Sequence, residues 1–407
     1  MILDRRTLLA GLAFAPGVTF ARETPPVWDF DLAAAPAKIY DRAVGHGFEP
    51  GPGRLFSVRV PEGDHQVTLD LGGDAASETT IKAEARRLML EAVRVPARGT
   101  ESRTFVVNVR RPDLAPPPPN APGGTHVLLN PREEGSYDWD DKLTLVFCGA
   151  TAAVRRIRIE PVVVPTVFLA GDSTVTDQRF EPAAGWGQML PRFFRPTVSI
   201  ANHAESGETL KSFLVERRLD KILGRIKPGD WLFVQFGHND QKANWPQTYA
   251  EAATTYRDYL RVYVGEARRH GARPVLVTSM HRRRFDPAGK VINTHGDYPQ
   301  AMRETAQALH VPLIDLHAMS AIFYEALGPK DAWKAFNDDG RDLTHHDNYG
   351  AYQLARCVVE GVRAGVPDLA AHLATDLPPF DPAKPPSPDT FALPPSAAAS
   401  QEPPRGN

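Results

Sequence analysis

Residues 164–178 read VPTVFLAGDSTVTDQ, a run of apolar residues that stops abruptly at glycine, aspartate and serine. A short continuous apolar run is typical of a strand buried on both faces, as in a parallel sheet covered by helices. Gly171 permits a sharp turn at the end of this strand. Ligands of such sheets gather at the carboxyl ends of the strands. We therefore expect Ser173 at a ligand-binding edge, either as a nucleophile or as the N-cap of a following helix.

After this strand, further apolar strands alternate with segments that have a helical pattern. Further apolar strands are predicted at 197–201, 231–236, 274–278 and 311–315, and helices at 249–270, 300–310 and 348–364. Alternating strands and helices indicate an α/β domain with a parallel central sheet and helices on both faces. We place this domain at residues 162–376.

Residues 24–161 have a different pattern, in which apolar and polar residues alternate. Short strands are predicted at 55–60, 66–71, 104–109, 142–147 and 156–159. Several short alternating strands without a clear helix predict an all-β sandwich domain. We expect the Pro-rich stretch 112–124 to be a surface loop, and the Pro- and Ala-rich tail 377–407 to be disordered.

The first residues resemble an export signal. Residues 1–21 combine a charged start, a short apolar stretch and small residues suited to cleavage after about Ala21. Arg5 and Arg6 resemble the start of a twin-arginine signal. A Sec signal or a lipid-retained start is the alternative. We predict an exported protein, either periplasmic or secreted, without stable membrane association.

Composition restricts the classes of partner. The formal net charge of -2 gives no electrostatic reason to expect a nucleic acid or an anionic membrane. Cys148 and Cys357 are predicted to be buried free thiols rather than a disulfide. The sequence has no nucleotide-binding loop and no zinc-binding motif, so no metal or organic cofactor is implied. Nothing in the sequence predicts the oligomeric state.

Three further segments fall at the same predicted edge as Ser173. Gly207 follows the second strand, Asn239 follows the third, and Asp342 and His345 precede the last helix. Acyl transfer requires a nucleophile, a base, a group that orients the base, and donors for the oxyanion. These residue types therefore indicate a hydrolase that works by acyl transfer. The sequence lacks the G-x-S-x-G motif of the α/β-hydrolases, so that hydrolase class is not supported.

GDS, a later glycine, GHND and DLTH, in that order, resemble the four blocks of the SGNH (GDSL-type) hydrolase superfamily. Within it, FLAGDSTVTD, GWGQML, NHAESGETLKSF, FVQFGHND and DLTHHDNYGA are similar to the rhamnogalacturonan acetylesterases, carbohydrate esterase family 12. The likeness covers residues 165–365. It implies a three-layer α/β/α catalytic domain, and residues 24–161 are similar to the galactose-binding-like domain that often precedes it.

The resemblance also implies roles for individual residues. Ser173 would be the nucleophile, His345 the general base, and Asp342 the group that orients His345. The backbone amides of Ser173 and Gly207 and the side-chain amide of Asn239 would form the oxyanion hole. Loss of one oxyanion donor typically costs about 10²–10³ in turnover.

Neighbours of these residues have other expected roles. The Asp-x-x-His spacing selects His345 over His346. His238 could line the pocket or serve packing, Asp172 is expected to hold the turn, and Asp240 to anchor a loop.

Some residues bear on the substrate. The family commonly has arginine where Glu208 stands, which puts a substrate contact from that position in doubt. The run Arg282–Arg284 could bind a uronate carboxylate, although a solvated charge run is the plainer interpretation. Trp186 and Trp245 could stack on sugars or belong to the core.

The interpretation is an exported serine esterase that removes acetyl groups from a plant cell-wall polysaccharide, with rhamnogalacturonan favoured on resemblance alone. The alternatives are a deacetylase of xylan or another hemicellulose, a small-ester lipase-like hydrolase, and a non-catalytic carbohydrate-binding protein.

Overall fold

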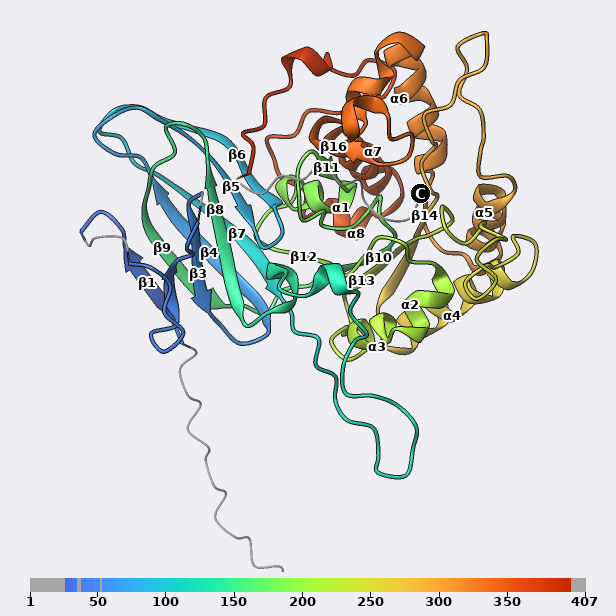
Figure 1. Ribbon diagram of the computed structural model, residues 1–407, viewed down its shortest axis with the longest axis horizontal. Helices are drawn as coiled ribbons and strands as arrows, with labels where there is room; N and C mark the ends of the chain where they lie inside the picture. Colours follow the sequence, from blue (N-terminus) through green and yellow to red (C-terminus); the bar gives the residue numbers. More distant parts are fainter. Residues whose placement is uncertain (1–25, 35–37, 52, 397–407) are drawn as a thin grey trace, which may run out of the picture.

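The computed structural model describes residues 26–34, 38–51 and 53–396. The predicted signal at residues 1–21 lies outside the described residues. Figure 1 shows two parts side by side, an all-β part formed by the first third of the chain and a mixed α/β part formed by the rest. None of the helices among the described residues combines the length and apolar character that crossing a membrane requires.

The N-terminal part is a β-sandwich of two antiparallel sheets. The strands of the first sheet, in spatial order, are β1 (Trp28–Asp31), β9 (Val154–Pro161), β4 (Gly63–Leu71) and β7 (Glu101–Val109). Those of the second are β2 (His46–Phe48), β3 (Leu55–Arg59), β8 (Lys142–Cys148), β5 (Ser77–Ala83) and β6 (Arg87–Val95). Alternate residues of β4, namely Val67, Leu69 and Leu71, are fully buried between the sheets, as the period of two predicts.

The hairpin of β5 and β6 was not predicted from the sequence. It carries Lys82, Glu84, Arg86 and Arg87, all of them buried. These charges interrupt the apolar alternation because this side of the hairpin contacts the α/β part instead of water. Lys82, for example, forms an ion pair with Glu181 (2.9 Å).

The α/β part is built on a five-stranded parallel sheet. Its strands, in spatial order, are β12 (Ser199–Asn202), β10 (Thr166–Gly171), β13 (Trp231–Gln235), β14 (Arg273–Val277) and β15 (Leu313–Ile314). A small antiparallel pair joins β11 (Ala183–Ala184) to β16 (His346–Asp347). All five predicted strands of the central sheet coincide with observed ones.

Helices cover both faces of this sheet. The first group is α1 (Trp186–Met189), α6 (Leu316–Asp331), α7 (Asn348–Gly365) and α8 (Pro367–Ala370). The second group is α2 (Leu210–Val215), α3 (Arg218–Leu223), α4 (Thr255–Arg269) and α5 (Tyr298–Leu309). Val167 and Leu169 of β10 pack with the first group, and Phe168 and Ala170 with the second. The fold is the three-layer α/β/α arrangement expected, preceded by a sandwich.

The C-terminal segment corrects one expectation. Residues 377–396 are not separate from the fold, and residues 397–407 lie outside the described part. Tyr349 donates its hydroxyl hydrogen to the Pro386 carbonyl (2.6 Å), and Phe391 packs edge-on against Tyr349. Lys82 donates to the Pro394 carbonyl (3.0 Å). A Pro-rich segment loses little conformational entropy on ordering, so a few aromatic contacts suffice to hold it.

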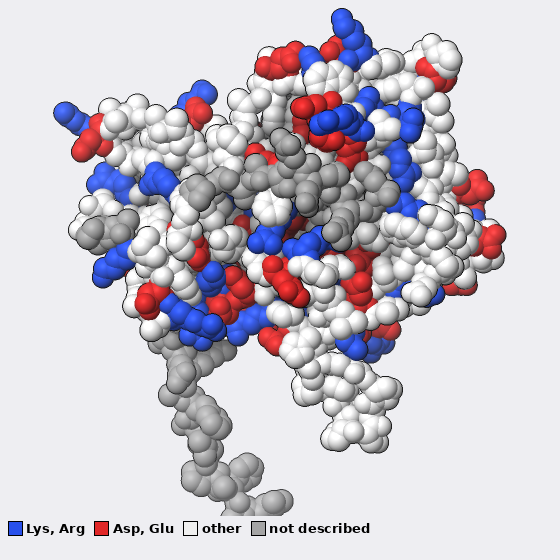
Figure 2. Space-filling model, viewed as in Figure 1, with Lys and Arg blue, Asp and Glu red and all other residues white. Residues whose placement is uncertain are grey.

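The surface has charges of both signs. Figure 2 shows basic and acidic side chains next to one another over both parts of the molecule on this face, in line with the small net charge. The predicted Pro-rich loop at residues 112–124 projects at the bottom of Figure 1 and is almost uncharged in Figure 2. Cys148 and Cys357 are both free and buried, as expected.

Candidate active site

Ser173 lies in the turn that follows β10, a strand with a neighbour on each side. The backbone amides of Val175 and Thr176 donate to the Asp172 carbonyl (3.0 and 3.1 Å), and the amide of Thr174 donates to Asp172 Oδ1 (3.0 Å). Asp172 therefore holds the turn, as predicted. No helix starts in this turn among the described residues, so the N-cap alternative for Ser173 is wrong.

Ser173, His345 and Asp342 form a hydrogen-bonded chain. Ser173 Oγ lies 2.8 Å from His345 Nε2, and His345 Nδ1 lies 2.8 Å from Asp342 Oδ2. With Nδ1–H donating to the carboxylate, Nε2 is free to accept the serine proton. The other carboxylate oxygen, Oδ1, accepts from the amides of Thr344 (2.8 Å) and His345 (3.0 Å). The Asp-x-x-His turn thus fixes both side chains.

The surroundings of Asp342 stabilise its ionised carboxylate. Burial alone would raise its pKa, but the hydrogen bond and charge of His345 and two backbone amides outweigh burial and hold the pKa well below its usual range. The carboxylate stays ionised at neutral pH and favours a positive charge on His345. This is the electrostatic arrangement that a histidine base needs.

Gly207 and Asn239 come together on the other side of the turn. Asn239 is fully buried and donates through Nδ2 to the Glu208 carbonyl (3.0 Å). An amide nitrogen has two hydrogens, so a second one is left for a ligand. Gly207 has φ +86°, and an added Cβ there would have no closer neighbour than Arg132 at 4.0 Å. This position requires glycine for its backbone conformation, not for lack of space.

Two contacts join these residues to Ser173. Gln178 Nε2 donates to the Ser173 carbonyl (2.8 Å) and to Ser206 Oγ (3.4 Å), the residue before Gly207. His238 Nδ1, from the residue before Asn239, lies 3.3 Å from Asp172 Oδ2. The structure thus brings every predicted site residue to one edge of the sheet. Gln178 was missed, although the string that carries the family resemblance ends only one residue before it.

The neighbouring residues take supporting positions. His346 points away from the chain of hydrogen bonds and lies 2.6 Å from the Tyr324 hydroxyl. Asp240 Oδ1 accepts from the amide of Leu210 (2.9 Å), the first residue of α2, which makes Asp240 the loop anchor that we expected.

Glu208 turns inward. Its carboxylate accepts from Ser212 Oγ (2.6 Å) and lies 3.5 Å from Arg218 Nε. Burial, opposed by the Arg218 charge, raises the pKa of Glu208 well above its usual range. The side chain is a packing element of α2 and α3, with only 2% of its surface exposed.

The predicted charge run Arg282–Arg284 is only partly solvated. Arg282 donates to the His238 carbonyl (3.1 Å) and to Thr344 Oγ1 (3.2 Å), and Arg283 donates to the Gly340 carbonyl. Arg284 alone is exposed. Arg282 therefore connects the segment that carries Asn239 to the segment that carries His345.

The two tryptophans differ. Trp186 is a core residue that donates through Nε1 to Gln235 (2.7 Å), so its ring is not open to a sugar. Trp245 is half-buried, with Lys242 Nζ 4.2 Å from its ring centroid. The amide of Lys242 donates to the Asn239 carbonyl (3.0 Å), so this pair follows directly from the site. Burial and the Arg282 charge lower the pKa of Lys242 to about 8.

The sequence profile of the GDSL-like lipase/acylhydrolase family matches residues 169–354. The chain is 42% identical over 223 residues to rhamnogalacturonan acetylesterase RhgT of Bacillus subtilis, a match that covers 51% of this chain and 94% of that protein. The chain belongs to the GDSL-like lipase/acylhydrolase family.

This GDSL-family chain is also similar to the probable rhamnogalacturonan acetylesterase YesY of Bacillus subtilis, with 39% identity over 200 residues that cover 48% of this chain and 92% of YesY. A crystal structure of the Bacillus subtilis protein YxiM aligns with a TM-score of 0.49 and 23% identity, over 83% of this chain and 98% of that one. As a member of the GDSL family, the chain is a carboxylic ester hydrolase.

Proposed function

We propose that this hydrolase removes acetyl groups from a carbohydrate, and that its preferred substrate is acetylated rhamnogalacturonan. The catalytic part rests on one observation, the hydrogen-bonded chain from Ser173 through His345 to Asp342. The substrate is supported by the similarity to two relatives, the rhamnogalacturonan acetylesterase RhgT and the probable rhamnogalacturonan acetylesterase YesY.

In the first half of the proposed reaction, Ser173 Oγ attacks the carbonyl carbon of the acetyl ester while His345 Nε2 takes the serine proton. The oxyanion accepts hydrogen bonds from the amides of Ser173 and Gly207 and from Asn239 Nδ2. Asp342 stabilises the protonated His345. The intermediate collapses when His345 returns the proton to the sugar oxygen, which leaves as an alcohol and leaves an acetyl group on Ser173.

In the second half, His345 Nε2 takes a proton from water, and the resulting hydroxide attacks the acetyl-serine. The same three donors hold the second oxyanion. His345 then protonates Ser173 Oγ, acetate departs and the enzyme is restored. No step requires a group beyond the residues named.

Lys242 and Trp245 are the proposed contact with the polymer. They follow Asn239 in two successive turns, and because Lys242 Nζ lies over one face of the half-buried Trp245 ring, we place the stacked sugar on the opposite face. The Lys242 ammonium beside it would attract the carboxylate of a uronic acid. An acetylated pectic chain offers both features, whereas xylan without acidic branches offers only the first.

We further propose a division of the chain. Residues 162–376 form the catalytic domain, and residues 24–161 form a sandwich whose function is to brace it. The buried contacts of Lys82, Arg86 and Arg87 with the loops after Ser173 support this role: Arg87 pairs with Asp177 (2.6 Å), and Lys82 and Arg86 with Glu181 (2.9 and 3.3 Å).

The test measures acetate released from acetylated rhamnogalacturonan, with acetylated xylan and a triglyceride as comparators and Ser173→Ala as the control. Release mainly from the pectic polymer that disappears in the variant is expected. Release mainly from xylan would keep the catalytic residues and replace the substrate by a hemicellulose, the second candidate. A triglyceride preference would contradict a carbohydrate substrate altogether.

A second assay isolates the polymer contact. Trp245→Ala should raise KM for the acetylated polymer by about two- to tenfold, in keeping with the roughly 0.5–1.5 kcal/mol of an aromatic contact. The same variant should leave kcat/KM for a small aryl acetate unchanged. Equal losses on both substrates would mean that Trp245 supports the fold and does not contact the polymer.

We also propose export, on the character of residues 1–21 alone. The test is a fusion of this segment to a reporter that functions only outside the cytoplasm. Reporter activity lost in a variant with Arg5 and Arg6 both replaced by lysine would identify the twin-arginine route. Activity retained in that variant would indicate the Sec route, and no activity from the unaltered segment would contradict export.

A further inference from the structure

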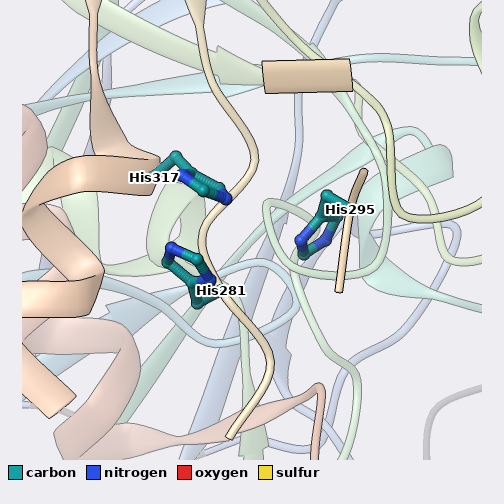
Figure 3. Close-up of side chains that lie close together, drawn as sticks. All are labelled: His281, His295 and His317. Atoms are coloured by element: carbon teal, nitrogen blue, oxygen red, sulfur yellow. The ribbon is translucent and has the colours of Figure 1, made fainter. Parts of the chain in front are cut away.

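Three buried histidines from three separate segments meet behind the active site. His281 follows β14, His295 lies in the loop before α5, and His317 is the second residue of α6. One ring nitrogen of each lies within 4.8 Å of a ring nitrogen of the other two. Figure 3 shows the rings of His281 and His317 next to one another, with His295 across from them. The centroids of the His281 and His317 rings are 3.6 Å apart, and the ring planes are tilted by 37°.

Four of the six ring nitrogens of this cluster have no hydrogen-bond partner among the described residues. Within residues 26–34, 38–51 and 53–396, neither nitrogen of His295 has a hydrogen bond, nor has Nδ1 of His281 or Nε2 of His317. All three residues are buried, His295 completely. An unpaired polar atom in the interior typically costs about 1–3 kcal/mol. A group that receives the lone pairs of these nitrogens would remove that cost.

The surroundings keep the three rings neutral, which is the form that binds a metal. Burial lowers the pKa of His281 to about 4, with a further contribution from the neighbouring His238. Burial lowers the pKa of His317 to about 3 and holds the pKa of His295 well below its usual range. At neutral pH each ring therefore keeps a lone pair on one nitrogen.

The backbone around the cluster is already fixed. The amide of His317 donates to Thr278 Oγ1 (2.9 Å), and the amide of His281 donates to Ser320 Oγ (3.0 Å). The ring of His281 also forms a hydrogen bond with the backbone of Ile292. Histidine ligands commonly have such a bond on the nitrogen that faces away from the metal. Here it leaves Nδ1 of His281 for the cluster.

We propose that His281, His295 and His317 bind one divalent transition-metal ion of the zinc class. Imidazole nitrogens suit zinc and its neighbours, whereas magnesium and calcium require oxygen ligands. Three histidines leave one position of a tetrahedron for water or hydroxide. Tetrahedral bonds of about 2.0–2.1 Å hold the ligand nitrogens about 3.3–3.4 Å apart, so the three rings would move closer together from their present spacing of up to 4.8 Å.

The ion would tie the loop between β14 and α5 to the start of α6. Arg282, next to His281, contacts His238 and Thr344, which flank Asn239 and His345. Metal binding would therefore restrict the movement of the segments that position the oxyanion donor Asn239 and the base His345. The metal has a structural role in this proposal, and the acyl transfer does not pass through it.

The experiment uses the full chain without a polyhistidine tag, freed of metal with a chelator and then dialysed against zinc. We expect one zinc per chain by elemental analysis and a melting temperature that rises with zinc concentration, because the ion binds the folded state alone. Magnesium and calcium should leave the melting temperature unchanged. Less than about a tenth of an equivalent of zinc bound by the wild-type chain would overturn the proposal.

Variants locate the binding. His281→Gln and His317→Gln should weaken zinc binding by more than the roughly 10–100-fold that loss of an outer-shell partner costs. The matched control is His126→Gln, because His126 is an exposed histidine two residues after the Pro-rich loop, and it should bind zinc like the wild type. Unchanged binding in both cluster variants would assign the zinc to another site and refute this one.

A spectroscopic readout on the wild type covers the case in which the variants do not fold. Cobalt should replace zinc and give the intense visible absorption of a tetrahedral site, which zinc then displaces. A weak spectrum of octahedral type would contradict the three-histidine site.

Discussion

Arg87 at the start of β6 and Asp177, four residues after Ser173, form an ion pair of 2.6 Å in which both side chains are 1% exposed. Arg87 also contacts Asp138 (3.0 Å) and the Asn108 carbonyl (2.8 Å), and Asp177 accepts from Asn202 Nδ2 (2.7 Å). The sandwich thus holds the loop that follows the nucleophile Ser173 through the fully buried ion pair of Arg87 and Asp177.

Arg87→Ala should lower the free energy of unfolding by about 3–5 kcal/mol, because it leaves the carboxylate of Asp177 buried without its cation. Arg156→Ala is the control, since its pair with Asp29 is half-exposed and such pairs contribute about 0–1 kcal/mol. Urea denaturation of both variants makes the comparison. Equal, small losses would mean that water reaches the Arg87 pair.

His345→Gln and His346→Gln should separate the base from its neighbour. The first should reduce kcat by at least about 10⁴-fold, since no other group accepts the Ser173 proton. The second removes the contact with Tyr324 and should lower the melting temperature while keeping kcat within about tenfold. The readout is turnover of a small acetate ester, with circular dichroism as the check on folding. A larger kcat loss in His346→Gln would reverse the assignment.

Asn239→Ala should lower kcat by about 10²–10³-fold with little change in KM, because an oxyanion donor acts mainly in the transition state. Asn120→Ala, an exposed asparagine of the Pro-rich loop, serves as the control. A rise in KM at constant kcat would show instead that Asn239 binds the ground state.

Asp240 makes stability depend on pH. Burial raises the pKa of this carboxyl to about 7, although the amide of Leu210 partly offsets the effect. Between about pH 4 and pH 7 the folded chain keeps a proton that the unfolded chain has released, so stability falls as the pH rises. Asp240→Asn should remove this contribution to the pH dependence of the free energy of unfolding.

The measurement is urea unfolding of the wild type and of Asp240→Asn at pH 5 and pH 8. Only about two pH units of this range lie below the pKa near 7, so at about 1.4 kcal/mol per unit the wild type should lose at most about 3 kcal/mol more than the variant. Glu205 and Asp347 titrate in both proteins and cancel in the difference. Parallel pH profiles would contradict a protonated Asp240.

The central sheet and the site were predictable because each element depends on residues that are close together in the sequence. Each strand is a continuous apolar run, and Ser173, Gly207 and Asn239 each follow one. Parallel pairing then brings them to a single edge without further knowledge. The Asp342-x-x-His345 spacing is likewise a property of one turn.

What the sequence did not reveal depends on contacts between distant segments. Arg87 in a strand looks like a surface residue until its partner Asp177 is known. His281, His295 and His317 have no short spacing, and only the pairing of β14 with β15 brings them together. The Pro-rich segment 377–396 has too few apolar residues for an independent core, yet it finds aromatic partners on α7.

The ammonium of Lys82 has consequences for how the chain folds. It lies in a strand made early in synthesis, but its partners are Glu181, the Pro394 carbonyl and the Ser396 hydroxyl (2.9, 3.0 and 2.8 Å). During synthesis this charge would therefore wait for its carboxylate partner until Glu181 is made, and for its two uncharged acceptors until residues 394 and 396 follow. The two halves are then better regarded as one cooperative unit, in which the contacts of Lys82 are complete only when residues 394 and 396 are in place.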